Sequence, residues 1–123
     1  MEEILALKLN AAWVVLSACN TGSGDGAGSE AVSGLRRAFF YAGARSLLVS
    51  KWPVETLSAR LLTADVFKRS AENPTLTRAE ALRQAMLWLM DTAGQRDASG
   101  KTEFTYAHPM FWAPFALIGD GGT

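Results

Sequence analysis

Two apolar strands joined by a helix constrain the fold of this chain more than any other feature. Residues 13–18 form a continuous apolar run, typical of a strand buried on both faces, and Ser46-Leu47-Leu48-Val49-Ser50 is predicted to be a second buried strand. Between them, apolar residues recur at helical spacing over residues 29–42. A strand–helix–strand unit is nearly always a right-handed crossover between parallel strands. We therefore predict an α/β fold in which the carboxyl ends of both strands, and so Cys19 and Ser50, lie at one edge of the sheet.

The segment after the second strand predicts two helices, at about 56–71 and 77–93. Asn73-Pro74 separates them, and Thr77 with Glu80 forms a capping box that opens the second helix. The residues predicted to face the core are Leu57, Leu61, Ala64 and Phe67 in the first helix, and Leu82, Ala85, Met86 and Leu89 in the second.

The C-terminal part predicts a polar loop and then a last strand. Residues 94–109 are polar and form a longer connection than most. Residues 111–118 are apolar, and Pro114 restricts them to an edge or bulged strand. The first strand has no earlier strand with which to pair. The chain is therefore expected to be a single partial domain over residues 1–123, the second half of a doubly wound sheet.

Charge and cysteine usage exclude several classes of partner. The chain has 12 basic and 12 acidic residues, and a balanced charge without basic runs argues against nucleic acid. No apolar stretch approaches the ~20 residues of a membrane span, so we expect no membrane partner. One cysteine cannot form an internal disulfide, which favours a reducing compartment and a cytoplasmic location.

The glycine-rich loop at 22–28 does not match a known nucleotide-binding spacing. It contains neither Gly-x-Gly-x-x-Gly nor the P-loop pattern, so a small nucleotide-binding protein is only a weak alternative. No serine stands in a Gly-x-Ser-x-Gly elbow. One cysteine and one histidine far apart do not make a metal site. We therefore expect neither a cofactor nor a metal.

Cys19 is the candidate nucleophile. It ends the first apolar strand, immediately before the glycine-rich loop, and in open α/β sheets the chemistry lies just beyond the carboxyl ends of the strands. A thiolate at this position can attack a carbonyl when a histidine activates it. A free cysteine can also be a small buried hydrophobic residue, and position alone favours that alternative.

The chain resembles the CHAT-domain family, caspase-like cysteine peptidases of clan CD that commonly follow tetratricopeptide repeats. The matching stretches occur in family order and cover nearly the whole chain. They are Val-Val-Leu-Ser-Ala-Cys-Asn-Thr-Gly at 14–22, Gly-Leu-Arg-Arg-Ala-Phe-Phe-Tyr-Ala-Gly-Ala at 34–44, Ser-Lys-Trp-Pro-Val at 50–54, Ala-Leu-Arg-Gln-Ala at 81–85 and His-Pro-Met-Phe-Trp-Ala-Pro-Phe-Ala-Leu-Ile-Gly at 108–119.

The resemblance implies a role for several residues. Cys19 matches the family nucleophile, whereas the catalytic histidine of the family lies on an earlier strand, and no histidine precedes Cys19 here. The N-terminal half that would carry that histidine is therefore expected to be missing from this chain. His108 matches a late segment and is expected to be structural, tying residues 94–109 to the last strand.

The resemblance also places the segment after the second strand beside the nucleophile. Ser50, Trp52 and Glu55 would line the substrate groove, with Trp52 walling a pocket and Glu55 setting its charge. Trp52 can equally be a core anchor. Glu30 is expected to stabilise a helix start rather than to organise the loop.

The function implied is that of a fragment of a cysteine endopeptidase that acts on protein substrates and is inactive alone. The alternative is a pseudopeptidase or interaction scaffold. By resemblance to caspases, residues 111–118 should pair antiparallel with 46–50 at the sheet edge. The expected partners are a protein or peptide substrate, the upstream half of the domain, possible tetratricopeptide repeats, and a second copy held through the open first strand.

Overall fold

A computed structural model of the chain describes residues 2–16, 27–92 and 94–122. These residues form two structural units, each described by itself. The first comprises Met1–Pro53 with Phe115–Gly121, and the second Val54–Pro114 with the C-terminal end.

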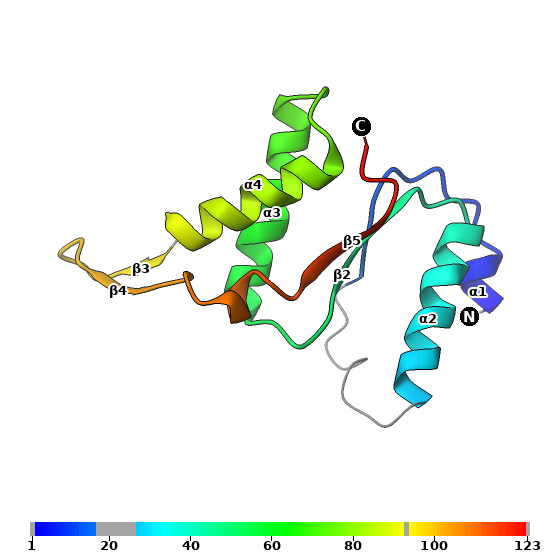
Figure 1. Cartoon of the computed structure of the whole chain (residues 1–123), viewed down its shortest axis with the longest axis horizontal. Helices are drawn as coiled ribbons and strands as arrows, with labels where there is room; N and C mark the ends of the chain where they lie inside the picture. Colours follow the sequence, from blue (N-terminus) through cyan, green and yellow to red (C-terminus); the bar gives the residue numbers. More distant parts are fainter. Residues whose placement is uncertain (1, 17–26, 93, 123) are drawn as a thin grey trace. The chain divides into compact units, whose positions relative to one another are not determined.

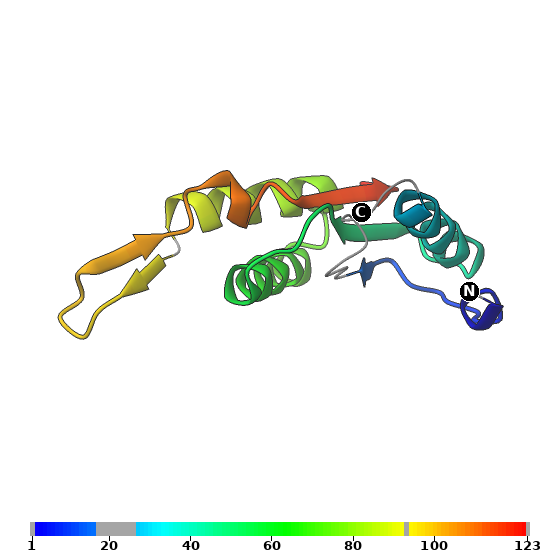
Figure 2. The same cartoon turned by 90° about the horizontal axis from the view of Figure 1, so that it is seen from below.

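The first unit contains a three-stranded sheet in the order β1-β2-β5. Strand β1 (Val14–Leu16) runs parallel to β2 (Ser46–Ser50), and β2 pairs antiparallel with β5 (Phe115–Gly119). Figure 2 shows β2 with β5 on one side and β1, the short blue arrow, on the other. The predicted parallel pair and the antiparallel edge strand are thus confirmed.

Helices α1 (Glu2–Leu5) and α2 (Ala27–Tyr41) complete this unit and lie side by side (Figure 1). Helix α2 begins two residues before the predicted start at 29. One buried hydrophobic cluster of the unit consists of Ala44, Leu47 and Val49. The partly buried side chains packed against it come from both neighbouring strands and from α2: Val14, Leu16, Phe39, Phe40, Ala116 and Ile118.

The last strand is shorter than predicted. Residues 109–111 form a 3₁₀ helix, η1 (Pro109–Phe111), and β5 begins only at Phe115, opposite Ser50. Proline favours the first turn of a helix, where its missing N–H costs nothing, and Pro114 has no N–H for the ladder. The apolar pattern at 111–118 therefore spans a helical turn, a bend and a strand.

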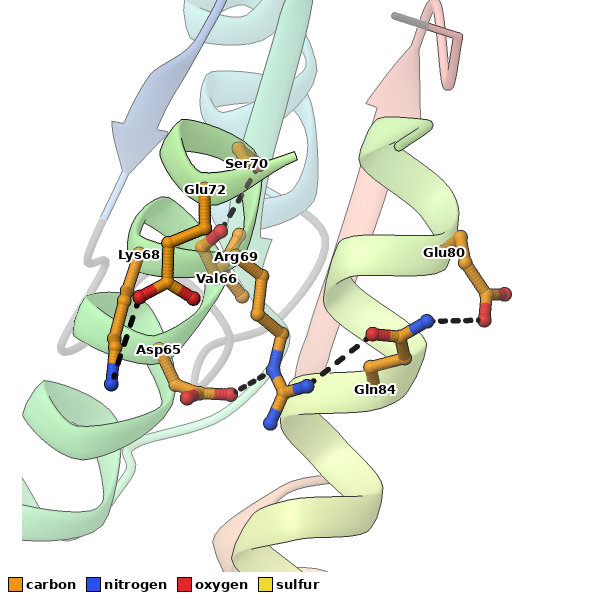
Figure 3. A network of polar contacts seen from close by, with 8 residues as sticks. All are labelled: Asp65, Val66, Lys68, Arg69, Ser70, Glu72, Glu80 and Gln84. Carbon is orange, nitrogen blue, oxygen red and sulfur yellow. Dashed lines mark hydrogen bonds and ion pairs between the residues drawn. The ribbon is translucent and has the colours of Figure 1, made fainter. Parts of the chain in front are cut away.

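In the second unit, α3 (Thr56–Glu72) packs against α4 (Arg78–Asp91). Thr77 caps α4 as predicted, its hydroxyl accepting from the Glu80 backbone N–H at 3.2 Å. The predicted stripe of α4 is largely confirmed, because Leu82, Ala85 and Leu89 are buried. A polar network crosses between the helices: the Arg69 guanidinium donates to Asp65 and to Gln84, and Gln84 donates to Glu80 (Figure 3).

The predicted stripe of α3 is wrong. The buried residues of this helix are Ser58, Leu62 and Val66, whereas Leu57 and Phe67 are 38% and 40% exposed. Apolar residues occur on both sides of α3. Helical spacing alone therefore could not tell which side of the helix packs against the rest of the unit. Ser58 lies one turn before Leu62 on the buried face, and its small side chain extends that face toward the start of α3.

The segment 94–109, predicted as a polar loop, contains a β-hairpin. Strands β3 (Gly94–Arg96) and β4 (Thr102–Thr105) pair antiparallel around a turn in which Gly100 has φ 85°. Glycine adopts this left-handed conformation without steric cost, and Asp97 binds the turn backbone. Within the described part of the chain, no helix is long and apolar enough to cross a bilayer.

Gly43 ends α2 and touches the N-terminal segment, so its replacement should be costly. It has φ 102°, and an added Cβ would lie 2.0 Å from the Leu9 carbonyl oxygen. We expect Gly43→Ala to lower the free energy of unfolding by about 2 kcal/mol or more, measured by chemical denaturation.

Gly100→Ala is the matched control for Gly43→Ala. Its φ is 85° but nothing lies within 4 Å of an added Cβ, so only backbone strain of about 1 kcal/mol should appear. Equal losses in the two variants would contradict the close contact between Gly43 and Leu9.

Candidate functional site

The candidate site is organised by the carboxyl ends of β1 and β2. Because these strands are parallel, with Leu16 opposite Val49, both end at the same edge of the first unit. Cys19 follows β1 in sequence but lies outside the described residues. Ser50 is the last residue of β2, is 9% exposed and pairs with Phe115. This edge is the one at which we predicted the chemistry.

Trp52 follows Ser50 in the same unit and is partly open to solvent. Its side chain is 41% exposed, and Lys51 and Pro53 beside it are exposed as well. A tryptophan that served only as a core anchor would be more completely buried. Within the described residues Trp52 thus lies at the surface of its unit rather than in its core.

Glu55 belongs to the second unit and is the N-cap of α3. Its two carboxylate oxygens accept hydrogen bonds from the backbone of the first turn: Oε1 from Leu57 N–H at 2.9 Å and Oε2 from Ser58 N–H at 2.7 Å. The Ser58 hydroxyl donates back to the Glu55 carbonyl at 2.9 Å. These backbone bonds, that from Ser58 foremost, hold the pKa of the Glu55 carboxyl below its ordinary value of 4.5.

This capping role was not foreseen from the sequence. Glutamate is not among the usual N-cap residues, so sequence rules predicted only a charge near the groove. The signal that was available is the spacing: Glu55 immediately precedes the first helical residue, and Ser58 lies three residues later. Glu55 remains exposed, so capping leaves its charge accessible to solvent.

Tyr106 is a residue of this region that sequence analysis missed. It is 2% exposed and makes edge-to-face contacts with Phe104 and Phe111, with ring centroids 5.4 and 5.0 Å apart. Burial first, and then the negative charge of Glu55, raise the pKa of the Tyr106 hydroxyl. The Tyr106 ring thus contacts both the hairpin and η1. The one sequence signal for this role was the position of Tyr106, two residues after another aromatic residue, Phe104.

His108 is structural, as predicted. Its Nδ1 accepts from the Met110 backbone N–H at 3.2 Å and so caps η1. Nearby, the Trp112 indole donates to the Ala107 carbonyl at 3.2 Å. With Nδ1 acting as an acceptor, a neutral His108 carries its proton on Nε2. These bonds lie within residues 107–112, after the hairpin, and a tie from His108 to the last strand stays a prediction.

Two further expectations concern charge and metal. Glu30 is the fourth residue of α2, and its side chain lies outside the described residues, so its expected role at the helix start stays a prediction. Among the residues that the structure describes, no group of three histidine, cysteine, aspartate or glutamate side chains gathers closely enough to hold a metal ion.

Comparison with known proteins identifies relatives by sequence. Residues 1–120 match the family model described as the CHAT domain. The chain is 30% identical over 117 residues to tetratricopeptide repeat protein 28 of Mus musculus. That alignment covers 95% of this chain and 4% of the mouse protein. No solved structure matches the chain.

The cap at Glu55 predicts a pH-dependent contribution to stability. Glu55→Ala should lower the free energy of unfolding at pH 7 by about 1 kcal/mol, whereas Glu55→Asp keeps a capping carboxylate and should lose less. The pKa of Glu55 is lower in the folded chain, so its contribution is present above the ordinary value of 4.5 and is lost as the pH falls further.

Urea titrations at a series of pH values measure this effect. The difference between wild type and Glu55→Ala should therefore shrink below pH 4.5. Glu72→Ala removes an exposed carboxylate from the other end of α3 and should change the stability by less than ~0.5 kcal/mol. A Glu55→Ala loss no larger than that of Glu72→Ala would show that the cap contributes nothing.

Proposed function

This chain belongs to the CHAT-domain family, and we propose that it is the nucleophile-bearing half of a caspase-like cysteine endopeptidase that acts on protein substrates. The observation that carries the proposal is the parallel pairing of β1 with β2. It brings the strand that leads to Cys19 and the strand that ends at Ser50 to one edge. The chain spans 4% of the length of its mouse relative, so the activity of the whole protein is part of the proposal.

In the proposed reaction the Cys19 thiolate attacks the scissile carbonyl of a bound peptide. The carbon–sulfur bond forms as the carbonyl oxygen takes up negative charge, and the backbone N–H of Cys19 donates to that oxyanion. As the oxyanion collapses, the carbon–nitrogen bond breaks and a histidine protonates the leaving amine. Water then hydrolyses the thioester, which releases the carboxylic acid and frees the Cys19 thiol. This chemistry needs no cofactor.

The base belongs to the upstream half of the domain in this proposal. A free thiol has a pKa of about 8.5, so little thiolate forms at neutral pH without a histidine beside it. The second donor of the oxyanion hole comes from the same upstream half, and one such donor contributes ~2.7–4 kcal/mol to transition-state stabilisation. His108 does not replace the base, because its Nδ1 already caps η1.

Ser50, Trp52 and Glu55 are the proposed substrate contacts. The exposed face of Trp52 would wall a pocket for a substrate side chain. The exposed Glu55 carboxylate would set the charge of that pocket while it caps α3. We also propose a cytoplasmic parent with tetratricopeptide repeats, which the name of the mouse relative supports, and self-association through the open edge of β1.

The proposal predicts activity only when the upstream half is present. The 123-residue chain alone should not cleave a fluorogenic peptide library. A longer protein that adds the preceding ~100 residues of the parent, enough for a half-domain, should cleave it and should react with a peptidyl electrophile directed at thiols. Cys19→Ala in the longer protein should abolish both signals.

His108→Asn is the matched control in the longer protein. Asparagine keeps a capping acceptor, so turnover should stay within ~2-fold of wild type. Cys19-dependent turnover by the 123-residue chain would overturn the half-site assignment and make His108 the candidate base. A longer protein that folds but neither cleaves nor is labelled would instead support the pseudopeptidase or scaffold alternative.

A further inference from the structure

The β3–β4 hairpin has side-chain contacts at both ends. At its tip, Asp97 Oδ1 accepts from Ser99 N–H at 2.9 Å, from the Ser99 hydroxyl at 2.6 Å and from Lys101 N–H at 2.9 Å. At its base, the Tyr106 ring packs against Phe104 and Phe111. Figure 2 shows the hairpin projecting beyond α3 and α4 of the same unit. Such an arm presents its strands to solvent in a fixed conformation.

The outer edge of β4 has unused backbone groups. Both backbone groups of Lys101 are used inside the hairpin, since its N–H donates to Asp97 Oδ1 and its carbonyl accepts from Asp97 N–H at 2.9 Å. Backbone groups of successive strand residues point to alternate sides. Those of Thr102 therefore point away from β3, toward the outer edge. Every residue of β4 is exposed, and a two-stranded ribbon is marginally stable by itself.

The charges on either side of Thr102 are self-complementary. Lys101 and Glu103 flank it, and both are exposed. Neither side chain has a hydrogen bond or ion pair within the described part of the chain, and the register shift leaves Glu103 opposite no residue of β3. An antiparallel copy of the same strand, turned about Thr102, presents a lysine to the glutamate and a glutamate to the lysine.

We propose that β4 is a self-recognition edge, where two copies of this chain pair antiparallel about Thr102 to form a four-stranded sheet. Thr102 and Thr102 of the partner subunit exchange both backbone hydrogen bonds. Lys101 then lies opposite Glu103 of the partner subunit, and the same pair recurs across the two-fold axis. These flanking positions are the non-hydrogen-bonded ones, whose side chains lie closest.

The backbone pairing is confined to Thr102, because the Gly100 N–H donates to the Asp97 carbonyl at 3.0 Å and Phe104 pairs with Gln95 of β3. The side chains at the neighbouring positions are compatible with the same register. Gly100 comes opposite Phe104 of the partner subunit, and nothing lies within 4 Å of the position of a Cβ on Gly100. The Phe104 ring is 46% exposed and can cover that glycine. A register centred on Glu103 would instead place two carboxylates opposite each other, which is destabilising. Electrostatics thus selects the pairing about Thr102.

Charge reversal and charge swap in the full chain test this pairing. In sedimentation equilibrium, Lys101→Glu and Glu103→Lys should each weaken dimerisation by about 10-fold or more, because two attractive pairs become two repulsive ones. The double variant Lys101→Glu/Glu103→Lys restores both pairs and should return the dimerisation constant to within ~3-fold of wild type. Glu72→Lys changes the net charge as Glu103→Lys does, but on α3, and should have no effect.

A cross-link gives the register directly. Thr102→Cys in a Cys19→Ser background should form a disulfide-linked dimer on mild oxidation, because hydrogen-bonded partners lie ~5.5 Å apart between Cα atoms, within the range of a disulfide. Thr105→Cys should not, because in this register the two copies of residue 105 lie ~20 Å apart. A monomeric wild type, a swap that fails to restore association, or equal cross-linking at both positions would each overturn the proposal. The self-association through β1 proposed above would persist in both single reversals, so the cross-link separates the two surfaces. Unchanged association in both reversals together with no cross-link at residue 102 would overturn the pairing about Thr102.

Discussion

The structure of the first unit depends on the central position of β2. This strand is buried along its whole length and pairs on one side with β1 and on the other with β5. Its parallel register with β1 is what brings the two carboxyl ends to one edge. Its antiparallel register with β5 sets where the C-terminal strand can begin, opposite Ser50. Leu47 and Val49 form the core around which Phe39 and Phe40 of α2 pack.

A second constraint recurs at the starts of α3, α4 and η1. Glu55, Thr77 and His108 each accept hydrogen bonds from backbone N–H groups that the first turn of a helix leaves unpaired. Asp97 does the same for the hairpin turn. Buried or constrained N–H groups need partners, and in these connecting segments side chains supply them. Two of these residues, Glu55 and His108, fall in the stretches where function was sought, so a structural role and a proposed chemical role have to be weighed at each.

The residues of the candidate site differ in how far the sequence predicted their placement. Ser50 and Trp52 follow directly from the end of β2, and their placement was predictable because a parallel pair must end at one edge. The cap made by Glu55 and the burial of Tyr106 were not predictable. The cap depends on a residue type that is unusual at an N-cap. The burial of Tyr106 depends on edge-to-face contacts with Phe104 and Phe111. The hairpin was not predicted because its strands are short and exposed. The composition of residues 94–105 therefore resembles that of a polar loop.

The sequence by itself determined the crossover from β1 to β2, the capped start of α4, the structural use of His108 and the family to which the chain belongs. These features rest on local patterns: apolar runs, a capping pair, and motifs in order. Only the tertiary structure decided which face of α3 packs, where the last strand begins, and that residues 94–105 form a hairpin. In each of these cases the local sequence pattern is compatible with more than one arrangement. Packing and pairing between elements make the choice, because burial and backbone pairing contribute more than local propensity.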